Sequence, residues 1–258
     1  MIRIKSNNEI ALLREGGKRL ASVLRTVAAK VADGAGTVDL ENLACALIEQ
    51  AGGRPSFKLY RPSSDSQPFP TALCISINNQ VVHGPATPNR IIKNGDIVSI
   101  DVGMEYPAKN GLFTDMATTV AVGKVSKEAR TLIKVTQKSL ELMIKKVRAD
   151  VTLFDLGKTV EDYVESYGFA VVRDLVGHGV GYGVHEEPQI PNFAQASSKQ
   201  IILKPGMVIA LEPMVNLGSF RIVTDRDGFT IRTADNSLSA HFEHTIAVTE
   251  HGYIILTA

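Results

Sequence analysis

The chain has 258 residues and an almost balanced charge, with 28 Lys+Arg against 27 Asp+Glu. This balance excludes an overall positive electrostatic field that would attract nucleic acid or acidic lipid. The only cysteines, Cys45 and Cys74, are too few for a disulfide framework. The start, MIRIKSNNEI, lacks the apolar core of a signal peptide, and no apolar run reaches membrane-spanning length. We therefore expect a cytoplasmic protein with no direct nucleic-acid or membrane binding.

Two helices are predicted at the start of the chain. Apolar residues recur at steps of three and four over residues 10–31, a pattern typical of a helix with one buried face. Asn7 or Asn8 can cap its start, and Asp33-Gly34 is expected to end it. Thr37 opens the second helix.

The same plan follows in the second part of the chain. Ser126 begins a third predicted helix, and Thr152 with Asp155 forms a start like a capping box for a fourth, which runs to Gly168. Helix, helix and then strands therefore occur twice. We expect one catalytic domain, residues 1–258, built from two related halves of about 1–124 and 125–258.

Strands and turns fill the rest of each half. Residues 72–84 form a β-type run, residues 110–111 are an Asn-Gly hairpin signal, and residues 227–228 are an Asp-Gly one. Residues 61–70, rich in proline and serine, are expected to form an exposed loop. Antiparallel hairpins with helices in separate runs indicate an α+β fold, in which helices cover the outer face of a curved sheet.

Four carboxylates occupy related positions in the two halves. Asp101 and Glu212 close two segments of one pattern, KNGDIVSID and KPGMVIALE, while Asp115 and Glu243 head later β-rich runs. Folded face to face, the halves would bring all four to one point. Their repulsion would be strong, so a cation is the expected occupant.

The ligand types indicate the chemistry. Carboxylates with one imidazole, His178, suit Mn²⁺, Fe²⁺ or Co²⁺, and the lack of thiolates argues against structural zinc. Four carboxylates exceed the need of one ion, so two bridged ions with a hydroxide between them as hydrolytic nucleophile fit better. His83 and His185 are then spare imidazoles that could donate to a carbonyl or its oxyanion.

Each residue also has an ordinary interpretation. A single aspartate at a strand end is usually solvated, and a single histidine is usually structural. Glu212 and Glu243 are harder to dismiss, because glutamate is rarely buried without a partner and both stand in apolar strand contexts. The duplicated placement favours a site.

The sequence resembles the type I methionine aminopeptidases of the bacterial kind over nearly its whole length. The resemblance rests on CISINNQVVHG, NGDIVSIDVG, LFTDMATT, VGHGVGYGVHEEPQI, LKPGMVIALEPM and LSAHFEHTIAVT. It implies the pita-bread fold, with two pseudo-symmetric halves around a dinuclear metal site. It also implies removal of an N-terminal methionine before a small second residue, by a water or hydroxide that bridges two metals.

The resemblance assigns a role to each candidate residue. Asp101 would chelate one metal, Asp115 and Glu243 would bridge both, and His178 and Glu212 would complete the second ion, with Glu212 also the general base. The residues implied to contact substrate are His83 and His185, the latter at the scissile carbonyl, together with a methionine pocket of Cys74, Phe69 and Phe229. The implied monovalent-cation site, for Na⁺ or K⁺, is at Asn78, Gln80 and Ser239.

The implied cofactors are two divalent ions per chain, from cobalt, manganese, iron or zinc. The implied partners are the N-termini of nascent polypeptides and the ribosome near its exit tunnel, with the enzyme a monomer. The chain departs from the family pattern at residues 61–70, which look inserted, at Phe229, where tryptophan is common, and at Val184, where an aromatic residue is frequent. These departures bear on pocket shape and not on the metal ligands.

Two rival interpretations remain open. A prolidase or aminopeptidase P would share the ligand set but carries an additional N-terminal domain, and only residues 1–82 precede His83 here. A non-catalytic pita-bread binding protein would usually have lost metal ligands, whereas this chain keeps all of them. Metal content and assays on Met-Gly and x-Pro peptides would separate the three.

Overall fold

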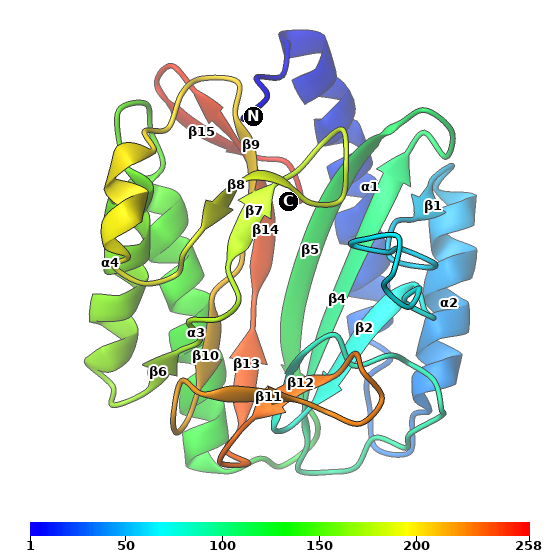
Figure 1. Ribbon diagram of the computed structural model, residues 1–258. Helices are drawn as coiled ribbons and strands as arrows, with labels where there is room; N and C mark the ends of the chain where they lie inside the picture. Colours follow the sequence, from blue (N-terminus) through cyan, green and yellow to red (C-terminus); the bar gives the residue numbers. More distant parts are fainter.

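The computed structural model describes all 258 residues. A nine-stranded antiparallel sheet crosses the molecule, with helices along its two outer sides (Figure 1). The helices are α1 (Asn7–Ala28), α2 (Thr37–Gln50), α3 (Lys127–Lys146) and α4 (Leu153–Glu165), with a short 3-10 turn, η1 (Ala196–Gln200). The predicted α+β class is confirmed.

The strands form one large sheet and two small ones. The large sheet contains β1 (Arg54–Pro55), β2 (Leu73–Ile77), β4 (Ile97–Tyr106), β5 (Leu112–Ala121), β7 (Gly177–Gly179), β8 (Glu186–Ile190), β9 (Val208–Leu211), β14 (Glu243–Thr249) and β15 (Gly252–Ile255). One small sheet contains β6 (Ala170–Val171), β10 (Met214–Asn216) and β13 (Ser239–His241), and the other β3 (Gln80–Val82), β11 (Ile222–Thr224) and β12 (Ile231–Thr233).

Each half of the chain has its own hydrophobic core. The first lies among residues 20–122, where α1 and α2 pack against the strands before residue 123. The second lies among residues 125–248, where α3 and α4 pack against β9, β10 and β14; from the first half it includes buried Ile97, and Ile2 packs against it. The strands β5 and β14 pair between the two cores, so one sheet joins both halves.

The first helix begins one or two residues earlier than expected. Ser6 is the N-cap, because its hydroxyl accepts the backbone N–H of Glu9 while the Glu9 carboxylate accepts the Ser6 N–H, a complete capping box. Asn7 and Asn8 therefore lie inside the first turn. The helix ends at Ala28, before the predicted Asp33-Gly34 stop.

The predicted starts of the third and fourth helices are confirmed. Ser126 caps α3 by accepting the N–H of Ala129. Thr152 and Asp155 form the predicted capping box of α4. This helix ends at Glu165, shortly before the left-handed Gly168.

Both predicted hairpins are present, but the loop of the first is longer than expected. The last pair of β4 and β5 is Tyr106 opposite Leu112, so the loop is 107–111 and not a two-residue Asn-Gly turn. Pro107 has no N–H to continue the ladder, which explains the longer loop. The hairpin at Asp227-Gly228 is confirmed, since β11 and β12 pair antiparallel around it. None of the helices is both long enough and apolar enough to cross a membrane.

Candidate metal centre

The register of the large sheet places three carboxylates on one face. Asp101 lies opposite Ala117, and Ala117 also lies opposite Glu243 on its other side. Asp115 precedes Ala117 by two residues and pairs with Gly103. Alternate residues of a strand share a face, so these carboxyl groups project together. Asp101 and Asp115 lie within β4 and β5, not at the strand ends that the sequence suggested.

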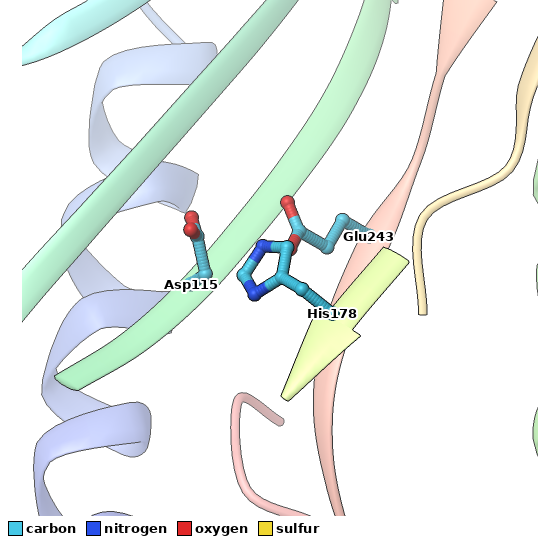
Figure 2. Close-up of side chains that lie close together, drawn as sticks. All are labelled: Asp115, His178 and Glu243. Atoms are coloured by element: carbon cyan, nitrogen blue, oxygen red, sulfur yellow. The ribbon is translucent and has the colours of Figure 1, made fainter. Parts of the chain in front are cut away.

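The other two candidate ligands, His178 and Glu212, come from the second half, as Glu243 does. His178 lies opposite Ala210, and Glu212 follows the end of β9 two residues beyond Ala210, so both face the same way. Figure 2 shows His178 directed between Asp115 and Glu243. One ligand atom from each of these three residues lies within 4.8 Å of the others. This geometry is suited to holding a metal ion.

Burial makes this cluster electrostatically costly without a cation. Desolvation raises the pKa of Asp115 to about 7. It also raises the pKa values of Asp101, Glu212 and Glu243 well above their usual range, and repulsion from Asp115 raises each further. Buried Asp101 Oδ1 and Glu243 Oε1 have no hydrogen-bond partner. Unpartnered buried carboxylate oxygens are the donor set that a divalent cation satisfies, so the residues present fit a metal.

His178 is oriented for coordination. Its Nδ1 lies 2.9 Å from the carbonyl oxygen of Gly179, which can only accept, so Nδ1 carries the proton. Its Nε2 therefore has a free lone pair, 3.4 Å from Glu212 Oε1. Burial lowers the pKa of His178 to about 3, with the charge of His185 adding to the effect. A neutral imidazole whose second nitrogen donates to a carbonyl is the usual arrangement of a metal ligand.

One residue of the site was missed by sequence reasoning. His241 is buried on β13, with Nε2 3.6 Å from Glu212 Oε2, and neither ring nitrogen has a hydrogen-bond partner. It stands two residues before Glu243, and that alternation was the signal available in the sequence. Glu212 is thus flanked by His178 and His241.

A pocket of about 570 Å³ opens above the cluster. All five candidate ligands lie on its wall, as do both spare imidazoles. Desolvation within the pocket, with repulsion from His185 adding to it, lowers the pKa of His83 to about 4, so His83 is neutral at pH 7. Its side chain follows a backbone with φ 58°, an uncommon left-handed conformation at the pocket rim.

The three residues predicted to bind the methionine side chain lie together on the same wall. Phe69 and Phe229 meet edge to face with ring centroids 5.6 Å apart, and Cys74 and Val184 belong to the same apolar cluster. Burial, with Asp101 adding to it, raises the pKa of the Cys74 thiol well above its usual range, so Cys74 is a neutral wall residue. The loop 61–70 is largely exposed as expected, but Phe69 in it is buried.

The residues of the predicted monovalent-cation site are neighbours. The N–H of Ser239 donates to the carbonyl oxygen of Asn78 at 2.9 Å. The side chain of Asn78 bonds Asp96, and the side-chain oxygen of Gln80 accepts from Arg90. Since these side-chain groups are engaged within the protein, backbone carbonyl oxygens are the ligands best available there. The cation site stays a prediction.

Residues 11–250 match the family described as metallopeptidase family M24. The chain belongs to this family, and its architecture is the pita-bread fold that the sequence resemblance implied. Within the family, its full-length relatives are methionine aminopeptidases. That of Clostridium perfringens is 46% identical over 100% of this chain and 99% of its own length. That of Aquifex aeolicus is 42% identical over 99% and 98%.

Solved structures agree with this placement. The methionine aminopeptidase of Thermotoga maritima superposes with a TM-score of 0.92 at 41% identity, covering 100% of this chain and 99% of that one. The prolidase of Pyrococcus horikoshii has a TM-score of 0.76 at 19% identity, covering 99% of this chain but 63% of that one. The prolidase similarity therefore shows a shared fold and nothing more.

Proposed function

We propose that this protein is a cytoplasmic aminopeptidase that removes the N-terminal methionine from nascent proteins and peptides when the second residue is small. The observation that carries this proposal is an apolar pocket wall of Phe69, Cys74 and Phe229 that leads to the carboxylate cluster. An apolar wall with a soft sulfur suits a thioether side chain. The cluster beside it suits hydrolysis at the adjoining peptide bond.

The proposed cofactor is a pair of divalent ions, from cobalt, manganese, iron or zinc. Asp101 would hold one ion, His178 and Glu212 the other, and Asp115 and Glu243 both. The excess of carboxylates over the need of one ion supports this arrangement, as do the unpartnered oxygens of Asp101 and Glu243. When bound, the ions would acidify a water and polarise the scissile carbonyl.

Glu212 is the proposed general base. Its carboxylate lies between two imidazoles, with Oε1 3.4 Å from His178 Nε2 and Oε2 3.6 Å from His241 Nε2. Burial raises the pKa of Glu212, so it accepts a proton more readily than an exposed glutamate. It would take the proton of the attacking water and return it to the leaving amine.

His83 and His185 are proposed to bind the substrate peptide. Both line the pocket, and desolvation within it lowers the pKa of each, so each is a neutral imidazole able to donate one N–H. His185 is assigned to the scissile carbonyl oxygen, where a donor stabilises the developing oxyanion. The proposed residues thus cover binding, proton transfer and oxyanion stabilisation.

A peptide series tests the proposal. Met-Gly, Met-Ala and Met-Ser peptides should be cleaved, and Met-Ile and Met-Lys hardly at all, because forcing a large second side chain into a filled site costs about 1–3 kcal/mol. Efficient cleavage before bulky residues would show that Val184, Phe229 or loop 61–70 has opened the pocket. Activity on x-Pro peptides alone would favour a prolidase, and metal binding without turnover a non-catalytic protein.

The proposed partners follow from this substrate. A methionine is free for removal as soon as the chain leaves the exit tunnel, so we propose that the enzyme acts there as a monomer on nascent N-termini. Co-sedimentation of the purified protein with translating and empty ribosomes, at increasing salt, would test the association.

A further inference from the structure

Tyr60 and His185 make a contact in the pocket above the candidate metal ligands. Tyr60 Oη lies 2.8 Å from His185 Nδ1, a hydrogen bond between residues 125 apart in sequence. The two rings meet edge to face with centroids 5.1 Å apart. Both side chains line the pocket above the carboxylate cluster.

His185 is restrained on a second side. The ring of His178 lies edge-on to it, with centroids 4.5 Å apart and an interplanar angle of 83°. Its Nδ1 is occupied by Tyr60, and Nε2 has no partner among the protein's hydrogen bonds. Nε2 is therefore the ring nitrogen left to meet a substrate.

The direction of the hydrogen bond decides what Nε2 can do. A phenol is a good donor and a weak acceptor, because its oxygen lone pair is delocalised into the ring, whereas an unprotonated imidazole nitrogen is a good acceptor. Burial raises the pKa of Tyr60, so the hydroxyl keeps its proton. The favoured arrangement has Tyr60 donating to Nδ1, which leaves the single imidazole proton on Nε2.

The backbone holds Tyr60 in place independently of the loop that follows it. The N–H of Leu59 donates to the carbonyl of Phe69 at 2.7 Å, and the N–H of Phe69 donates to the carbonyl of Tyr60 at 2.9 Å. The N–H of Tyr60 donates to the carbonyl of Phe57 at 2.8 Å. These bonds form a stem from which residues 61–68 extend, so Tyr60 belongs to the stem and not to the loop.

We propose that Tyr60 is a positioning residue that fixes His185 in the tautomer protonated at Nε2. The Nε2–H group is then available to donate a hydrogen bond to the scissile carbonyl oxygen. The tautomer is a property of the resting protein. Its consequence for turnover rests on the proposed function.

The tautomer is measured directly by nitrogen NMR. Protein labelled with ¹⁵N-histidine and freed of metal is recorded by long-range ¹H–¹⁵N correlation above neutral pH, with His185→Gln to assign the signal. The wild type should show a pyridine-type Nδ1 and a pyrrole-type Nε2 at His185. Tyr60→Phe should show averaged signals of mixed tautomers. Tyr182→Phe is the matched control, because Tyr182 stands three residues before His185 but its hydroxyl donates to Glu9.

Kinetics of the metal-loaded enzyme on a Met-Ala peptide supply the second readout. Tyr60→Phe keeps the aromatic wall, so KM should be unchanged, while kcat should fall roughly three- to ten-fold, the worth of one hydrogen bond. Tyr182→Phe should keep both constants.

Each outcome decides the proposal. A wild-type proton on Nδ1, or a His185 spectrum unaffected by Tyr60→Phe, overturns the positioning role. Mixed tautomers with unchanged kcat overturn its catalytic consequence. Failure of the wild type to cleave any methionine peptide would refute the proposed function, while the spectra would still decide the tautomer.

Discussion

Replacing Lys5 by methionine should destabilise the protein through a residue remote in sequence. Lys5 Nζ lies 2.8 Å from Glu186 Oε2, and the two side chains are only 1% and 6% exposed. The other carboxylate oxygen, Oε1, accepts the N–H groups of Tyr182 and Gly183. Methionine keeps the length of the lysine stem but removes the charge, so Glu186 would be left buried without its cation.

The expected loss is at the low end of the range for such pairs. Removing one partner of a buried ion pair costs about 3–5 kcal/mol. Two backbone N–H groups still neutralise part of the Glu186 charge, so we expect about 3 kcal/mol. In a chain of this size that corresponds to a melting temperature lower by about 6–12 °C.

Urea unfolding followed by circular dichroism measures the loss. Lys5→Met combined with Glu186→Gln should recover part of it, because the amide oxygen still accepts the backbone N–H groups and no buried charge remains. Lys158→Met breaks the exposed pair with Asp162 and should change the unfolding free energy by no more than the experimental error. A loss below about 1 kcal/mol for Lys5→Met would refute the burial argument.

Four further outcomes are expected. Glu243→Ala or Asp115→Ala should lose metal, measured by elemental analysis, and nearly all turnover, while circular dichroism shows a retained fold; normal turnover at limiting metal would contradict the bridging assignment. His185→Ala should lower kcat on the order of 10²–10³-fold at unchanged metal stoichiometry, and a loss of metal would make it a ligand instead. Since burial raises the pKa of Asp115 from 3.8 to about 7, its folded state favours the proton. The metal-free protein should therefore lose stability relative to Asp115→Asn as pH rises from about 4 through 7, in urea titrations across pH, and added metal should reverse this trend. Met1-Ile2, a poor substrate start, should survive in the mature chain, as intact mass would show.

The sequence carried the ligand types of the site but not all of its geometry. Asp101 and Glu212 were visible because a repeat of local pattern needs no tertiary information. The position of Asp101 within its strand could not be predicted, because the β4–β5 ladder runs past Asp101 to Tyr106 and places it in the middle of β4. His241 escaped notice because its contact with Glu212 arises only when β13 pairs with β10. The bond of Tyr60 to His185 likewise exists only in the folded chain.

The pairing of β5 with β14 determines when the folding chain becomes able to bind metal. It is a short seam, with Glu243 opposite Ala117 and His244 opposite Met116 as its register, whereas β4 and β5 pair along their whole length. Each half brings its own core and only part of the donor set, so neither half alone can hold a metal as the whole does. Tight metal binding is therefore a sign that β5 and β14 have paired. A chain whose two halves are folded but not paired through β5 and β14 would have no catalytic activity.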